Sequence, residues 1–117
     1  MKSNDFRLLL SDVFKEYNAF FGHNTGSFNE LNYKINYQII SSLLAEGQRT
    51  YVLDIDVWCK SNVDVDDIAD EIESLLNYKS KFSGSWVSFF LENRYNADEN
   101  NIFRRTLTYE VRTYMED

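Results

Sequence analysis

Two carboxylates, Asp54 and Asp56, are the residues of this sequence whose type and spacing best suit chemistry. They lie two apart in the alternating segment 51–58, so they share one face of a predicted strand. Paired carboxylates can bind a divalent metal or serve as acid and base. The alternative is a solvent-facing pair opposed by Arg104 or Arg112 from a neighbouring strand. We favour this second interpretation.

The other reactive residues do not form a recognisable site. His23 is the only histidine and Cys59 the only cysteine, so a zinc site would lack its usual ligands and no internal disulfide can form. The acidic run with Asp64, Asp66 and Asp67 lacks the glycine and distal glutamate of a calcium loop, and it is better explained as a helix start. No glycine-rich phosphate loop, nucleophile elbow or HExxH motif occurs. The sequence therefore predicts no catalytic residue, cofactor or metal.

Composition narrows the class of protein. The chain has 117 residues, which suits one domain over residues 1–117. Its formal charge of −7 argues against tight nucleic-acid binding, because an acidic surface repels phosphate backbones. Aromatic residues make up 16%, and large rings are favoured in cores and at interface centres, so some should face a partner. No run of about 18 apolar residues occurs, so we expect no membrane span and synthesis in the cytoplasm.

Periodicity predicts two helices and a sheet. The first helix should span residues 4–18, with Ser3 or Asn4 as its cap, and the second should carry an apolar stripe from Val65 to Leu76. The expected strands are 32–40, 51–58, 85–92 and 102–114, with a short strand or bend in 20–27 and polar turns at 77–84 and 93–101. The second helix has two candidate caps: Asn62 and Asp64. We therefore expect an α/β (α+β) fold, with an antiparallel or mixed sheet and both helices on one face, in the order α-β-β-(β)-α-β-β.

Leu43, Leu44 and Trp58 are candidate contact residues. The two leucines are adjacent apolar residues in segment 41–49, which is otherwise small and polar and should protrude as the loop of a hairpin. They either reach a partner or fold back onto the core. Trp58 shares the parity of the two aspartates, so its ring either covers the edge of the core or contacts a neighbouring subunit.

The charged residues of two alternating strands should lie on one sheet face. Asp54, Asp56, Arg104 and Arg112 have one parity along their strands. The apolar residues beside them have the other parity: Leu53, Ile55, Leu107 and Val111. If the strands are neighbours, the acids and arginines can pair across the sheet or between subunits. Arginine can engage a carboxylate through two hydrogen bonds, so such pairs would fix the orientation of a contact.

Four segments in this order resemble the tail terminator (tail completion) proteins of long-tailed bacteriophages, of the tail-to-head joining family. An N-terminal helix is followed by the bend NAFFGHNTGSF, and the strand YVLDIDVW stands just before the second helix. That helix carries DIADEIESLL, and a basic pair leads into the terminal strand IFRRTLTYEVRTY. The resemblance spans essentially the whole chain. Relatives often carry prolines in the loop before the second strand, whereas this chain has none.

The resemblance implies a structural protein of the virion tail that assembles with copies of itself as a ring, usually a hexamer. Such a ring caps the head-proximal end of the tail tube, stops tube polymerisation and provides the surface on which the head docks. Its other partners are then the major tail tube protein and the head completion or connector protein. DNA passes through the lumen without specific binding, and no membrane is involved.

Other functions stay open on the sequence alone. One is a head-completion or adaptor protein at the portal, which is also a ring. Another is a small host-directed binding protein. A third is a metal-dependent enzyme built on Asp54 and Asp56. The mass of the native protein separates a ring from the last two, because a ring is much heavier than a monomer of 13.9 kDa.

Overall fold

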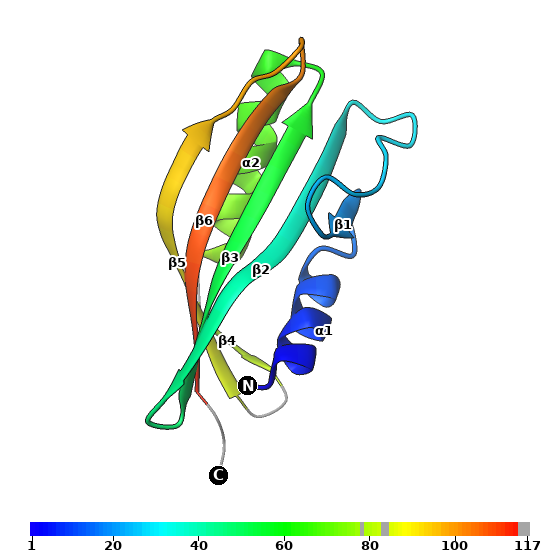
Figure 1. Cartoon of the computed structure of the whole chain (residues 1–117). Coiled ribbons are helices and arrows are strands. Elements are labelled where there is room, and N and C mark those ends of the chain that lie inside the picture. The colour runs from blue at the N-terminus through cyan, green and yellow to red at the C-terminus, as the bar shows by residue number, and fades with distance from the viewer. Residues whose placement is uncertain (78, 83–84, 115–117) are drawn as a thin grey trace.

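The computed structural model describes residues 1–77, 79–82 and 85–114, which form two helices and one six-stranded sheet. The sheet order is β1-β2-β3-β6-β5-β4; β1 runs parallel to β2, and the other neighbouring pairs are antiparallel. The expected α+β fold, a mixed sheet with both helices on one face, is confirmed (Figure 1). In chain order the elements are α1 (Ser3–Val13), β1 (Ala19–Phe21), β2 (Tyr33–Ala45), β3 (Gln48–Cys59), α2 (Asn62–Leu76), β4 (Lys79–Phe82), β5 (Ser85–Asn96) and β6 (Phe103–Tyr114).

Both helices pack on the same sheet face because apolar side chains alternate along the central strands. Helix α1 stacks Phe6 on Tyr51, with ring centroids 4.3 Å apart, and Phe14 on Tyr37 at 4.8 Å. Helix α2 lies over β3 and β6 and buries its apolar stripe there. The buried residues of this stripe are Val65, Ala69, Ile72 and Leu76. The hydrophobic effect of burying these side chains, and those of α1, is the main contribution that holds the helices on the sheet.

The helix caps differ from the sequence-based expectation. The cap of α2 is Ser61, whose Oγ accepts a hydrogen bond from the Asp64 N–H at 3.3 Å. The cap of α1 is Lys2, which makes no side-chain cap bond. The residues expected to cap lie inside the helices instead: Ser3, Asn4, Asn62 and Asp64. In the part of the chain that the structure describes, no helix has the length and apolar character needed to cross a membrane.

Helix α1 is also shorter than periodicity predicts, because it ends at Val13 and not at residue 18. Asn18 explains the difference. Its side-chain amide donates hydrogen bonds to the carbonyls of Ser27, Phe28 and Tyr33. These bonds hold the chain in position to enter β1, so the backbone leaves the helical path before that point. Apolar spacing continues past the helix because the following turn still packs on the core.

Segment 41–49 is not a loop but the outer part of a β-hairpin, which we call the arm. Strand β2 continues to Ala45 and β3 starts at Gln48, with Glu46 and Gly47 between them at φ of +54° and +76°. Positive φ at both central residues matches the type I′ turn that suits the twist of paired strands. The arm projects beyond the helices in Figure 1. Its β2 residues are exposed, so they lack the apolar alternation that reveals a strand in sequence.

The opposite edge of the sheet also contains more β-structure than the sequence predicts. Strand β4 pairs with the start of β5, where only a turn was predicted. Strand β5 continues to Asn96, through residues assigned to the polar turn 93–101, after a bulge between Leu91 and Asn93. Polar residues are tolerated near a sheet edge because water can solvate one face and the outer backbone.

The connection between β1 and β2 folds over the sheet face that carries no helix. Asn36 donates a hydrogen bond to the Thr25 carbonyl at 2.9 Å, and Lys34 donates to an amide oxygen of the same connection at 3.0 Å. Gly26 has φ of +73°, and a Cβ added there would lie 2.2 Å from the Phe20 ring. Both the backbone angle and the ring therefore require glycine at this position.

We predict that Gly26→Ala lowers the free energy of unfolding by about 3 kcal/mol, through left-handed strain plus displacement of the Phe20 ring. Gly47→Ala is the matched control, because it has φ of +76° but nothing within 4 Å. Gly47→Ala should lower the free energy of unfolding by about 1 kcal/mol, from backbone strain alone. Urea unfolding of both variants measures the difference. Equal losses would contradict the packing of this connection against Phe20.

Candidate functional site

The helix-free side of the sheet, which we call the open face, carries most of the residues singled out from the sequence. Strands β2, β3 and β6 place their side chains there in rows, because directly paired residues share a face. One row is Lys34, Trp58 and Arg104, and the next is Asn36, Asp56 and Thr106. A third row is Gln38, Asp54 and Thr108. The expected shared face of the acids and arginines is thus observed.

The two aspartates bond to threonines, not to arginines. Thr106 Oγ1 donates to Asp56 Oδ1 at 2.5 Å, and Thr108 Oγ1 donates to Asp54 Oδ1 at 2.8 Å. Asp56 is buried, with 7% of its surface exposed. The interpretation in which Arg104 or Arg112 opposes these acids within the subunit is therefore wrong. The register is the reason, because it sets a threonine directly opposite each aspartate.

Arg104 instead covers Trp58. Its Cζ lies 4.7 Å from the centroid of the Trp58 ring, and Lys34 Nζ lies 5.4 Å from the same ring. Such contacts are favourable because the negative face of the ring attracts the cation. Trp58 is consequently buried by side chains of its own subunit. Lys34 is itself buried, and desolvation lowers the pKa of its ammonium group.

Arg112 lies further along the open face, opposite Thr50. It donates to Glu110 Oε2 of its own strand at 2.9 Å, and its Cζ lies 4.7 Å from the Phe90 ring on β5. Its side chain is 46% exposed and Phe90 is 41% exposed. This pair is therefore an accessible part of the open face on its β5 side.

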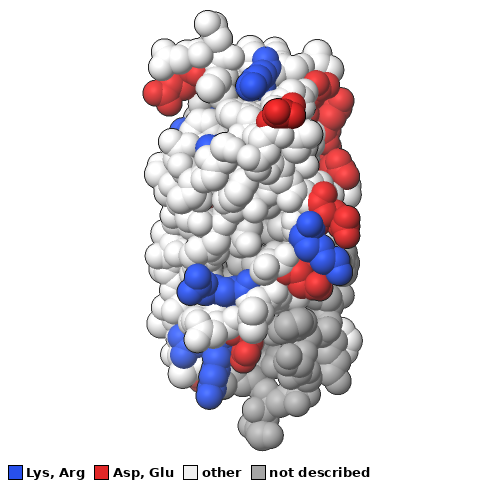
Figure 2. Space-filling view, turned by 90° about the vertical axis from the view of Figure 1, so that its right-hand side faces the viewer, with Lys and Arg blue, Asp and Glu red and all other residues white. Residues whose placement is uncertain are grey.

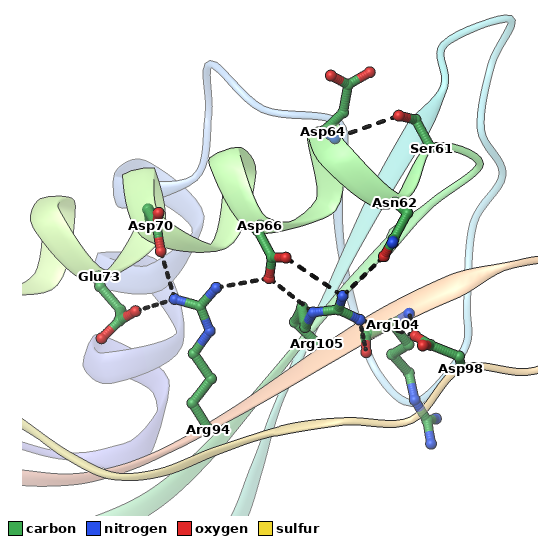
Figure 3. Close-up of polar contacts among 10 residues, drawn as sticks. All are labelled: Ser61, Asn62, Asp64, Asp66, Asp70, Glu73, Arg94, Asp98, Arg104 and Arg105. Carbon is green, nitrogen blue, oxygen red and sulfur yellow. Dashed lines mark hydrogen bonds and ion pairs between the residues drawn. The ribbon is translucent and has the colours of Figure 1, made fainter.

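An ion-pair cluster on the opposite face was missed by the sequence analysis, and Figure 3 shows it. Arg105 of β6 donates to Asp66 Oδ1 and to Asp98 Oδ1, both at 2.8 Å. Arg94 of β5 contacts Asp66 at 3.0 Å and also pairs with Asp70 and Glu73 of α2. The bond from Arg105 lowers the pKa of the Asp66 carboxyl, and the same bond raises the pKa of the Arg105 guanidinium. The cluster ties α2 to the two strands beneath it.

A parity argument could have found Arg105. It lies on the same face as Phe103 and Leu107, so its guanidinium enters the helix-covered side, where its side chain is only 4% exposed. A buried cation needs carboxylate partners. Helix α2 is rich in aspartate and glutamate, so it is the element expected to supply them. Figure 2 shows the acidic side chains gathered along the side of the molecule where α2 lies.

The arm exposes two adjacent apolar side chains. Leu43 is 67% exposed and Leu44 is 51% exposed, and Ile40, just before the arm, is 50% exposed. The interpretation in which the two leucines fold back onto the core is therefore wrong. Register explains this, because they lie in the part of the hairpin that extends past α1 and α2 (Figure 1).

The remaining reactive residues, including His23 and Cys59, do not form a cluster in the described part of the chain. Among the described residues, no three His, Cys, Asp or Glu side chains lie close enough to hold a metal ion. His23 is exposed in the connection over the open face. Cys59 is fully buried at the end of β3, where its Sγ accepts a hydrogen bond from the Ser61 N–H. The described surface also includes the arm with its two exposed leucines, two sheet edges and the hydrogen-bonded open face.

Comparisons with known proteins relate the fold to a virion component. No protein-family model and no curated protein matches the sequence. A solved chain from the virion of a native gene transfer agent particle is similar in structure, with a TM-score of 0.62 and 9% identity. The match covers 92% of this chain and 85% of that one. A second solved structure, whose name describes no function, has a TM-score of 0.62 and 13% identity, and the match covers 97% and 94% of the two chains.

We predict that Arg105→Met lowers the free energy of unfolding by about 2 kcal/mol, because it leaves Asp66 and Asp98 with fewer partners. The loss is smaller than for a fully buried pair, since these carboxylates are half-exposed. Lys15→Met is the control: it removes an exposed pair with Asp12 and should change stability by less than about 0.5 kcal/mol. Chemical denaturation tests both. An equal, small effect would mean that the cluster does not hold α2.

Proposed function

We propose that the protein is a non-enzymatic structural component of a phage-like virion. In this proposal its copies form a ring, a hexamer by the resemblance to tail terminators, that caps the head-proximal end of the tail tube. The ring stops tube polymerisation and gives the head completion or connector protein its docking surface. The observation that carries the proposal is the fold shared with a chain of the gene transfer agent virion over 92% of this sequence. Four sequence segments support the same class independently.

Exposed apolar side chains support a protein that works by contact. They gather on the arm, at Leu43 and Leu44, and on β5, at Phe90, Leu91 and Tyr95. Groups of exposed apolar residues in a folded protein mark surfaces that bind partners. In a ring, one such surface serves the neighbouring copy, and a second serves the tail tube or the head protein.

The open face supports a structural role for the acids. Each aspartate accepts a hydrogen bond from a threonine hydroxyl, so the pair forms part of a cross-strand ladder between β3 and β6. Among the residues proposed as contacts, Arg112 is exposed and remains a candidate for the subunit interface. Trp58 and Arg104 cover one another, so in the proposal they shape the face beside the contact.

Charge fits the proposed place in the virion. The chain carries a formal charge of −7, and the exposed side of α2 is acidic (Figure 2). A surface that repels phosphate allows DNA to slide past without adhering. The proposal therefore places DNA in the lumen as cargo without specific binding. The protein would be made in the host cytoplasm and end in the virion.

We predict a closed ring, either of the isolated protein or on purified tail tubes, because one heterologous contact repeats until it closes. Light scattering after size exclusion measures the mass, and labelling in virions shows whether the protein lies at the tail side of the junction or at the portal. Monomers alone, together with no binding to tail tubes, would refute the proposal.

The arm provides a matched variant for the same assay. Leu43→Ser combined with Leu44→Ser should leave the melting temperature nearly unchanged, because both side chains are exposed, but should reduce ring formation and tail–head joining. Leu8→Ser is the control, since Leu8 is 63% exposed on α1, away from the arm.

A further inference from the structure

The outer edge of β2 is unusually bare. Strand β1 pairs only with Ile35–Tyr37, so among the described residues no strand covers the outer side of residues 38–45. This stretch, QIISSLLA, contains no charged residue and no proline. Edge strands normally carry charge, proline or a cover, because unpaired backbone groups bind other strands. The outer edge of β2 is therefore an exposed sheet edge of the kind to which an additional strand can pair.

A second bare edge lies at the other side of the sheet. Strand β4 pairs only with residues 85–88 of β5, which leaves residues 89–96 without a described strand on their outer side. Phe90, Leu91 and Tyr95 lie on this stretch, and each is at least 40% exposed. Each edge is thus covered at one end by a short strand and open at the other.

We propose that, in the assembled ring, the bare edge of β2 in one copy pairs with the bare edge of β5 in the next copy. This inference rests on the proposed ring and specifies which surfaces form it. Three successive antiparallel pairings, β2 with β3, β3 with β6 and β6 with β5, make β5 run opposite to β2. Copies in a ring point the same way along its axis, so these two edges meet as an antiparallel pair.

The register follows from the cover strands. Across one copy, Ser41 lies in the same row as Phe90, and Leu43 in the same row as Ser88. Without an offset, Leu43 would meet the part of β5 that β4 already covers. An offset of two residues moves Leu43 past the end of β4, so the new pairing ends at Leu44, and it keeps every side chain on its own face because strand side chains alternate. It sets Leu43 opposite Phe90 on the open face.

The same offset pairs Leu44 with Phe89 on the helix side and Ser42 with Leu91. Apolar residues thus meet on both faces of the joined strands, as in a continuous sheet. Two residues correspond to a stagger of about 7 Å, which over four strands requires a tilt of about 20° from the ring axis. Tilted strands are the normal way in which a staggered sheet closes on itself.

A second copy is the occupant because the two edges complement one another on a single chain. They have opposite direction, similar length and apolar residues at matching positions. Pairing of β2 with β2 would close a two-fold dimer and leave both β5 edges bare. Pairing of β2 with β5 leaves no bare edge in a closed ring, which explains why the β2 edge can lack charge and proline.

Cross-linking of two variants, each with one introduced cysteine beside the native Cys59, tests the inference. A tagged Leu43→Cys protein is mixed with an untagged Phe90→Cys protein under conditions of assembly and oxidised mildly. Directly opposite residues place their Cβ atoms about 5 Å apart, close enough for a disulfide after small adjustment. We expect the mixed dimer in several-fold excess over the dimers from either variant alone. The native Cys59 is fully buried, so the unmodified protein should give no product.

Three controls make the outcome specific. Val63→Cys, 72% exposed at the start of α2, should not cross-link to Phe90→Cys. Ser41→Cys should react more slowly than Leu43→Cys, because it tests the register without the offset. Ser42→Cys with Leu91→Cys keeps Leu43 and Phe90 intact, and it should cross-link even if the first pair weakens assembly.

The results separate the inference from the proposed function. Rings with cross-links only between the β2 and β5 variants support both. Rings that give dimers of Leu43→Cys alone, or no cross-link with either pair, overturn the edge pairing and leave the ring standing. Absence of assembly, both in solution and on tail tubes, overturns both.

Discussion

The pairing of β3 with β6 is the interaction on which the rest of the structure depends. Every residue from Gln48 to Cys59 has a partner between Phe103 and Tyr114, so these two strands form a continuous ladder through the middle of the sheet. The ladder separates two chemistries, because alternation sends apolar side chains to one face and polar ones to the other. Helices α1 and α2 cover the mainly apolar face, while threonines, aspartates, Arg104 and Arg112 lie on the other.

Two arginines on the helix-covered side explain how the acidic helix α2 can pack on this sheet. Arg94 and Arg105 project from β5 and β6 toward α2, where carboxylates receive them. On the open face, in contrast, Arg104 and Arg112 find aromatic rings. Cations therefore join neighbouring elements on both sides, by ion pairs under the helix and by ring contacts on the open side.

The central ladder and both helices could be predicted from the sequence because their side chains alternate or recur at helical spacing around a core. The arm, β4 and the end of β5 could not, since strands that expose their faces carry no such pattern. Leu43 and Leu44 stand out in the sequence as adjacent apolar residues in a polar segment. Their strand conformation does not, because the β2 residues of the arm are exposed on both faces. The partners of Asp54 and Asp56 depend on register, which places Thr108 and Thr106 opposite them. Parity alone identifies the face and not the neighbour.

The central strands β3 and β6 are paired along their whole length, whereas β1 and β4 cover only part of β2 and β5. The proposed ring depends on this contrast. A chain that works alone would be expected to guard residues 38–45 with charge or a cover. A chain that completes its sheet with other copies has no such need. The proposed pairing between copies would explain both the bare edge of β2 and the projecting arm.

Amide hydrogen exchange of free and assembled protein tests this account most directly. Backbone amides of residues 38–44 and 89–95 should exchange faster in the free protein than those of β3 and β6, and should slow markedly on assembly, because new strand pairing protects them. The turn of the arm at Glu46 and Gly47 should change little. Unchanged exchange in both edge segments, with protection appearing elsewhere, would contradict the claim that copies of this chain complete one another's sheets.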